Sequence, residues 1–185
     1  MKEICIYGRG GQGSLVLAQF MAIAALEDDK YGQAFPFLGG GGERRGKAIM
    51  AFCRLDDKPI RLRCRVSKAD YLIVQDATIF NEEPVLEKVK ADGTVLVNTE
   101  KSSGELGLEQ LPNLYTVQAE KLARQILGRP IMNTALLGAF GAVTGELSLE
   151  AMVQAVKRKF QGQLGDKNAQ VVIEAYNALA GSDVK

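Results

Sequence analysis

A glycine-rich turn near the start of the chain has the spacing of an anion-binding loop. The apolar residues 4–6 predict a short strand, an apolar-periodic run from Ser14 predicts a helix, and four glycines lie between them, at Gly8, Gly10, Gly11 and Gly13. A strand, a glycine turn and a helix in this order point backbone N–H groups and a helix N-terminus at an anion. The same glycines also match the dinucleotide pattern G-x-G-x-x-G, which alone is a weak signal.

Dinucleotide binding would need a further residue, an acid about 20 residues beyond the loop that holds a ribose. Glu27, Asp28 and Asp29 lie in that region, but they read as a polar helix end, and no clear second strand places them. A packed turn, with or without contact to a phosphate or a partner, therefore fits the residues better. Independent NAD(P) or flavin binding by a Rossmann-like oxidoreductase stays open as the alternative function.

Two neighbouring arginines are the better candidates for an anion clamp or a subunit contact. Glu43, Arg44, Arg45 and Gly46 follow the glycine run 39–42. Arginine suits either role because its planar guanidinium makes paired hydrogen bonds to carboxylates and phosphates.

A polar pair, Asn133 and Thr134, begins an apolar segment of the chain. These side chains favour a helix N-cap, since short polar side chains there accept hydrogen bonds from free backbone N–H groups. A position facing a ligand is the other interpretation.

Further basic residues alternate with apolar ones. Arg61, Arg63 and Arg65 recur at a period of two, which predicts a strand with all three on one sheet face, and Arg54 and Lys58 add to the cluster. Such a face needs acids or phosphates opposite it, or it is simply solvated. Nucleic acid is a poor match, because aromatic residues are not interleaved and the net charge is only +1.

Composition narrows the chemistry that this chain can perform by itself. It has no histidine, and its three cysteines lie in strand-like runs without C-x-x-C spacing. The cysteines read as buried thiols in a reducing compartment, so we expect no catalytic residue and no metal ligand. No apolar run approaches the ~18 residues of a membrane span, and no signal peptide is visible, which predicts a cytoplasmic protein.

Alternating strands and helices predict an α/β fold: a three-layer αβα domain with a mostly parallel sheet and one antiparallel hairpin. We expect a single domain over residues 1–185, with 181–185 as a frayed tail. Pro36 excludes 31–37 from a central strand position. The expected strands are 2–6, 47–55, 59–66, 71–74, 94–97 and 114–117, the second and third of these forming the hairpin. The expected helices are 14–28, 80–90, 119–127, 132–144, 148–160 and 167–180.

Several short motifs, in this order along the chain, resemble the gamma subunit of 2-oxoacid:ferredoxin oxidoreductases. They are Gly8-Arg9-Gly10-Gly11-Gln12-Gly13, Gln33-Ala34-Phe35-Pro36, Glu43-Arg44-Arg45-Gly46, Val74-Gln75-Asp76, Val97-Asn98-Thr99 and the run from Gly128 to Phe140. The similarity extends from residue 2 to about residue 178, and its Glu-Arg-Arg-Gly form resembles the pyruvate (pyruvate synthase) branch more than the 2-oxoglutarate branch.

The resemblance implies a non-catalytic subunit of an enzyme that converts a 2-oxoacid to acyl-CoA, carbon dioxide and reduced ferredoxin. Alpha-, beta- and delta-type subunits are the implied partners, and ferredoxin acts through the complex. Thiamine diphosphate, magnesium and the iron–sulfur clusters are implied on those other subunits, while this chain is implicated in contact with coenzyme A.

The candidate cofactor-binding residues are then Gly8, Gly10, Gly11, Gln12, Gly13, Glu43, Arg44, Arg45, Gly46, Asn133 and Thr134. The chain departs from the family pattern in its longer run of glycines, 39–42, and in Lys47-Ala48-Ile49, where Ala-Pro-Val is more usual. Extra glycines cost little loop-closure entropy, so we expect altered contacts at this loop rather than misfolding.

Overall fold

The structure is a computed structural model that describes residues 1–37 and 46–181. The predictions for glycines 39–42, for Glu43, Arg44 and Arg45, and for residues 182–185 of the expected tail therefore concern positions outside the described residues.

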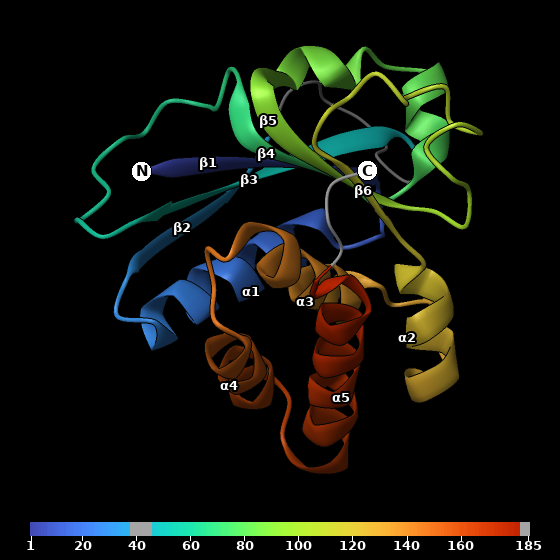
Figure 1. Cartoon of the computed structure of the whole chain (residues 1–185). Coiled ribbons are helices and arrows are strands. Elements are labelled where there is room, and N and C mark those ends of the chain that lie inside the picture. Colours follow the sequence, from blue (N-terminus) through green and yellow to red (C-terminus); the bar gives the residue numbers. More distant parts are fainter. Residues whose placement is uncertain (38–45, 182–185) are drawn as a thin grey trace.

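A sheet of six strands forms the centre of the described chain (Figure 1). The strands are β1 (Lys2–Arg9), β2 (Tyr31–Pro36), β3 (Ala48–Asp56), β4 (Ala69–Val74), β5 (Val89–Asn98) and β6 (Leu114–Val117). Their order is β2-β3-β1-β4-β5-β6; the neighbours from β1 to β6 pair in parallel, and β3 is antiparallel to both β1 and β2. The predicted α/β class with a mostly parallel sheet is confirmed, and β2 is an edge strand, as Pro36 requires.

The antiparallel hairpin consists of β2 and β3, so the predicted pairing of 47–55 with 59–66 is wrong. Cys53 in β3 is opposite Ile4 of β1 on one side and Ala34 of β2 on the other, so β3 has no free edge for another strand. Residues 59–66 are consequently irregular, and the predicted one-sided arginine face does not exist, because Leu62 and Cys64 between the arginines are exposed as well.

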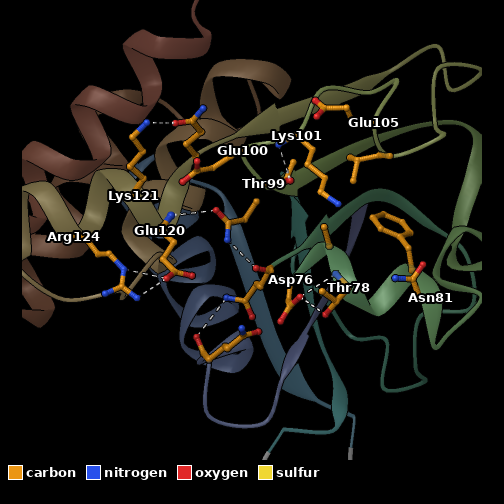
Figure 2. A pocket seen from close by; sticks show the side chains of 17 residues that line it. Asp76, Thr78, Asn81, Thr99, Glu100, Lys101, Glu105, Glu120, Lys121 and Arg124 are labelled. Carbon is orange, nitrogen blue, oxygen red and sulfur yellow. Dashed lines mark hydrogen bonds and ion pairs between the residues drawn. The ribbon is translucent and has the colours of Figure 1, made fainter.

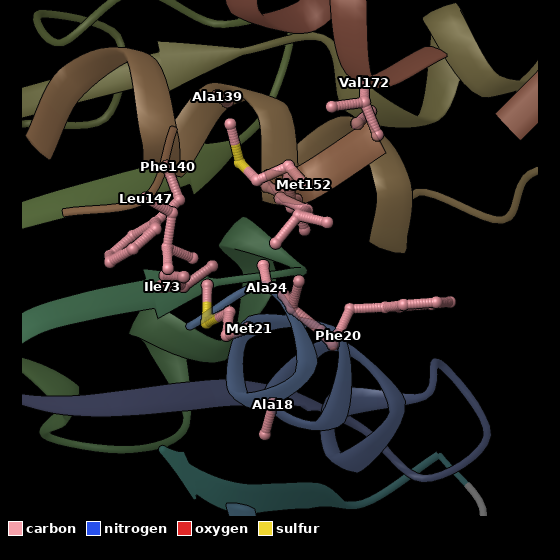
Figure 3. Packing of buried hydrophobic residues seen from close by; sticks show 14 of the residues in the cluster. Ala18, Phe20, Met21, Ala24, Ile73, Ala139, Phe140, Leu147, Met152 and Val172 are labelled. Carbon is pink, nitrogen blue, oxygen red and sulfur yellow. The ribbon is translucent and has the colours of Figure 1, made fainter. Parts of the chain in front are cut away.

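The α-helices gather on one face of the sheet (Figure 1). They are α1 (Ser14–Glu27), α2 (Ala119–Leu127), α3 (Asn133–Thr144), α4 (Leu149–Lys159) and α5 (Gly162–Leu179). Phe20 and Met21 of α1, Phe140 of α3 and Met152 of α4 belong to one cluster of buried residues in this core (Figure 3). None of the helices in the described parts of the chain combines the length and hydropathy that a membrane span needs.

The opposite face of the sheet is covered by loops and two short 3₁₀ helices, η1 (Ala77–Asn81) and η2 (Val85–Lys88). Ile4 and Ile6 of β1 point into the helical core, whereas Cys5 and Tyr7 point into this second core, so the strand is buried on both sides. The predicted α-helix over 80–90 is wrong. Pro84 removes one backbone donor and disfavours helical geometry at the residue before it, which splits the segment into two tight turns.

Helices α3 and α5 approach closely through a glycine. A Cβ added at Gly138 would collide with the carbonyl oxygen of Val172 in α5. Only glycine therefore allows the two helices to lie this close to each other.

Candidate functional site

The carboxyl ends of the parallel strands meet at one edge of the sheet, where their loops enclose a pocket of about 520 Å³. Its lining comes from the glycine loop, from the segments after β4 and β5, and from the start of α2 (Figure 2). Ligands of open α/β sheets bind at this edge, and the volume suits a small molecule or part of a larger cofactor.

Backbone conformation and packing explain three of the glycines around the turn from β1 to α1. Gly11 and Gly13 have φ angles of 102° and 80°, in the left-handed region that favours glycine. A Cβ at Gly8 would collide with Gln75 Oε1 and with Ser14 Oγ, and one at Gly13 would lie 2.6 Å from Asn133 Nδ2. The loop is therefore a tightly packed turn, and Gln12 within it borders the pocket.

A buried polar network beneath the loop fixes the elements around the pocket. Gln75, fully buried after β4, accepts a hydrogen bond from Ser14 Oγ at 2.6 Å and donates to Asn133 Oδ1 at 2.9 Å. Asn98 at the end of β5 donates to the Gln75 carbonyl at 3.0 Å and accepts from the backbone N–H of Glu120 at 3.1 Å. The network thus ties the glycine loop to two strands and to the first turns of α2 and α3.

Asn133 and Thr134 do not cap α3, so that interpretation is wrong. Met132 is the N-cap residue and makes no side-chain cap bond. Both polar side chains are buried inside the first turn, where Thr134 Oγ1 donates to Asn168 Oδ1 of α5 at 3.1 Å. Of the two, only Asn133 adjoins the glycine loop, and neither lines the pocket.

Arg9, within the glycine loop, is occupied by contacts inside the chain. Its guanidinium donates to Asp76 Oδ2 at 2.9 Å, to Glu82 Oε1 at 2.7 Å, to Thr78 Oγ1 and to the Gly46 carbonyl at 2.9 Å. The bond to Glu82 is the main cause that raises the pKa of Arg9 above its usual value. Because these acceptors already occupy its donors, Arg9 stabilises the conformation of the loop and is not available to bind an anion.

The partners of Arg9 are held in their charged forms. Partial burial of Asp76 raises its pKa, but hydrogen bonds from Thr78 and Arg9 outweigh burial, and the pKa lies below its usual value. The pKa of Glu82 is lowered mainly by its bond from Arg9. Asp76 also caps η1 by accepting from the Thr78 backbone N–H at 3.0 Å.

The structure brings Gly46 against the glycine loop. The Gly10 N–H donates to the Lys47 carbonyl at 2.9 Å, and the Gly46 N–H donates to the Gly10 carbonyl at 3.3 Å. Gly46, the last residue of the Glu43–Gly46 motif, is therefore a neighbour of the glycine loop, although Glu43, Arg44 and Arg45 lie outside the described residues.

The pocket is bordered by seven charged residues, and none of them was predicted as a site residue from the sequence: Asp76, Glu100, Lys101, Glu105, Glu120, Lys121 and Arg124. Four acids and three bases give the lining a formal charge of −1, so it is close to neutral, and Arg124 pairs with Glu120 at 2.8 Å. For Asp76, Glu100 and Lys101, the position just after the predicted strands 71–74 and 94–97 was the available signal, because residues that follow parallel strands collect at the carboxyl edge.

The cysteines differ from one another. Cys5 and Cys53 are buried as predicted, and burial raises the pKa of Cys5 to about 12 and that of Cys53 further still. Cys64 is exposed, contrary to the prediction, because it lies in the irregular segment rather than in a strand.

The acids considered for a ribose are at the wrong end of α1. Asp28 accepts hydrogen bonds from the Ser148 N–H and hydroxyl at 2.7 and 2.6 Å, and Glu27 pairs with Arg158 at 3.0 Å. A helix of 14 residues is about 20 Å long, which separates these carboxylates from the glycine loop. The alternative function, dinucleotide binding, therefore lacks the acidic residue that would hold the ribose near the glycine loop.

Known proteins resemble this chain over nearly its whole length. A family model described as pyruvate ferredoxin/flavodoxin oxidoreductase matches residues 3–178. The pyruvate synthase subunit PorC of Methanocaldococcus jannaschii is 48% identical, with 97% of each chain covered. The pyruvate/ketoisovalerate oxidoreductases common subunit gamma of Thermococcus kodakarensis is 45% identical, with 96% of each chain covered.

Solved structures resemble this chain as well. The pyruvate oxidoreductase subunit PORC of Thermotoga maritima superposes with a TM-score of 0.80 at 34% identity, covering 96% of this chain and 97% of that one. A 2-oxoglutarate:ferredoxin oxidoreductase chain of Magnetococcus marinus, solved with 2-oxoglutarate, coenzyme A and succinyl-CoA bound, has a TM-score of 0.76 at 18% identity. It shares the fold, and this whole chain corresponds to 32% of it. The predicted resemblance is therefore confirmed: the chain belongs to the pyruvate ferredoxin/flavodoxin oxidoreductase family, as a gamma-type subunit.

Proposed function

We propose that this gamma-type subunit assembles with alpha-, beta- and delta-type subunits into a cytoplasmic 2-oxoacid:ferredoxin oxidoreductase, with pyruvate as its 2-oxoacid. The complex converts the oxoacid and coenzyme A to acyl-CoA and carbon dioxide and passes the electrons to ferredoxin. Thiamine diphosphate, magnesium and the iron–sulfur clusters belong to the other subunits, and residues 1–185 act as one domain. Sequence identities of 48% and 45%, over nearly the full length, to named subunits of such enzymes support this assembly.

Within the complex, the pocket at the carboxyl edge and the adjoining glycine loop form this chain's contribution to the coenzyme A site. The observation that carries this proposal is that Gln12 belongs to both the loop and the pocket lining. Coenzyme A, which supplies the thiol that accepts the acyl group, has an arm with amide groups and a phosphorylated nucleotide. The side chains of Gln12 and Gln118 suit the amides, because their NH₂ groups make no hydrogen bond within the described residues and can donate to a carbonyl.

The phosphates need cations, and the described lining is too nearly neutral to supply them all. Lys101 and Lys121 border the pocket, whereas Arg9 is occupied by Asp76 and Glu82. Arg44 and Arg45 are the further cations that we assign to this role, since Gly46, the next residue, is hydrogen-bonded to Gly10. The planar guanidinium of arginine can form two parallel hydrogen bonds to one phosphate.

Charge reversal in the whole complex tests this function. The Arg44→Glu/Arg45→Glu pair should raise the KM for coenzyme A or prevent assembly, and should leave the KM for pyruvate unchanged in any complex that forms. Lys159→Glu/Lys167→Glu, two exposed residues of α4 and α5, gives the same charge change as a control. Normal assembly together with a normal KM for coenzyme A would refute the assigned role. Failure of the wild-type chain to co-purify with pyruvate- and coenzyme A-dependent activity would refute the assembly.

A further inference from the structure

We infer that residues 58–68, here called the basic segment, are a docking surface for an acidic face of another subunit. This inference rests on the proposed assembly and adds the surface and the chemistry of its partner. The basic segment joins β3 to β4 and lies at the amino edge of the parallel strands, opposite the pocket (Figure 1, teal loop at the left). It carries five cations and no acid: Lys58, Arg61, Arg63, Arg65 and Lys68.

All five cationic residues are exposed. None of them takes part in an ion pair within residues 1–37 and 46–181. The chain as a whole has a net charge of only +1, so its positive charge is locally concentrated here. Like charges this close repel one another, and opposing carboxylates would relieve the repulsion.

A buried arginine holds this exposed segment in one conformation. Arg54, with no exposed surface, donates to the Leu62 carbonyl at 3.3 Å and to the Cys64 carbonyl at 2.6 Å. Gln33 of β2 also donates to the Leu62 carbonyl, at 3.2 Å, and Val66 is buried. The backbone that carries Arg61, Arg63 and Arg65 is therefore anchored from beneath, which lowers the conformational entropy lost on binding.

The composition and shape of the basic segment favour a protein partner. Arginine is enriched in protein interfaces and lysine is depleted, and three of the five cations are arginines. Leu62, 43% exposed between Arg61 and Arg63, adds an apolar contact at the centre. The basic segment does not line the described pocket, as a small anion would require, and it lacks aromatic residues that could stack on nucleic-acid bases.

A competition for incorporation tests the inference on the complex itself. Wild-type chain and the Arg61→Glu/Arg63→Glu variant are co-expressed with the other subunits, one of which carries the tag. The ratio of the two chains in the purified complex and in the lysate is then measured by mass spectrometry. Neither side chain makes a hydrogen bond or ion pair within the described residues, so the variant should fold, which circular dichroism checks. The control competition uses Lys159→Glu/Lys167→Glu, which changes the net charge equally.

We expect the Arg61→Glu/Arg63→Glu chain to be roughly tenfold under-represented in the complex relative to the lysate, since repulsion replaces attraction at the contact. The control should be incorporated as well as wild type. Equal incorporation of both variants would overturn the docking surface and leave the assembly intact. Normal incorporation with a raised KM for coenzyme A would also overturn it, in favour of a small anion. Absence of even the wild-type chain from the complex would refute the proposed function, and the docking surface with it.

Discussion

Replacing Arg54 by alanine should destabilise the protein more than any other single arginine substitution in the described chain. Its side chain is fully buried, pairs with Glu3 at 2.9 Å, donates to Gln33 at 3.1 Å and lies 4.9 Å above the Phe35 ring. Removing one partner of a buried ion pair costs about 3–5 kcal/mol. Glu3 keeps 21% of its side chain exposed and can regain water, so we expect the lower end, about 3 kcal/mol.

That loss is large compared with the ~5–15 kcal/mol stability of an ordinary domain. For a chain of this length it corresponds to a fall in Tm of about 6–12 °C. Thermal and urea unfolding of the isolated chain, followed by circular dichroism at neutral pH, measure the change. Arg61→Ala, at an exposed arginine of the basic segment, is the matched control and should stay within about 0.5 kcal/mol of wild type.

The lysine variant separates charge from geometry. Arg54→Lys keeps the positive charge but cannot reach Glu3 and both loop carbonyls with one fork, so it should recover only part of the stability. If Arg54→Ala unfolds at the same urea concentration as Arg61→Ala, the buried guanidinium does not hold the basic segment, and the preorganisation argument fails.

Three further measurements address the loop, the thiols and the acid response. Gly8→Ala should lower the free energy of unfolding by about 1–3 kcal/mol, because its Cβ would enter the buried network; a Tm equal to wild type would contradict that packing. A thiol reagent at pH 8 should modify one cysteine of the native isolated chain, Cys64, while Cys5 and Cys53 react only after unfolding; two or more rapid equivalents would be inconsistent with their burial. Because the pKa of Asp76 is lower in the folded than in the unfolded state, its stabilising effect is complete above about pH 4 and disappears as the pH falls through the folded pKa. Urea unfolding between pH 6 and pH 2 should therefore depend less steeply on pH in Asp76→Asn than in wild type, and identical slopes would show that Asp76 does not contribute.

Elements were predicted correctly where the hydrophobic pattern of the segment itself determines its structure. Buried runs such as 4–6 and 71–74 read as strands of a covered sheet and are central parallel strands in the structure. Segment 59–66, wrongly predicted as a strand, does alternate apolar and basic residues with a period of two. To join the sheet, it would also need a neighbouring strand with a free edge. Both sides of β3 are occupied by β1 and β2, which only the assembled sheet reveals.

The site was harder to predict than the fold, because its contacts join residues far apart in the chain. Gln75 and Asn133 were visible as motif residues, yet nothing local indicates that they bond to each other across 58 positions. From the sequence, Arg54 was added to the basic cluster of Arg61, Arg63 and Arg65. Its burial depends on Glu3, 51 positions earlier, and on loop carbonyls that follow it.

The close contact between α3 and α5 gives the domain a mechanical property. Gly138 fixes the spacing of the two helices against the Val172 carbonyl, and Thr134 ties the same helix to Asn168. Asn133, the residue before Thr134, bonds to Gln75 beneath the pocket. Helix α3 is therefore rigidly connected both to the outer helix α5 and to the strand ends beneath the pocket. Any displacement of α5 relative to the sheet must either break these contacts or move the floor of the pocket.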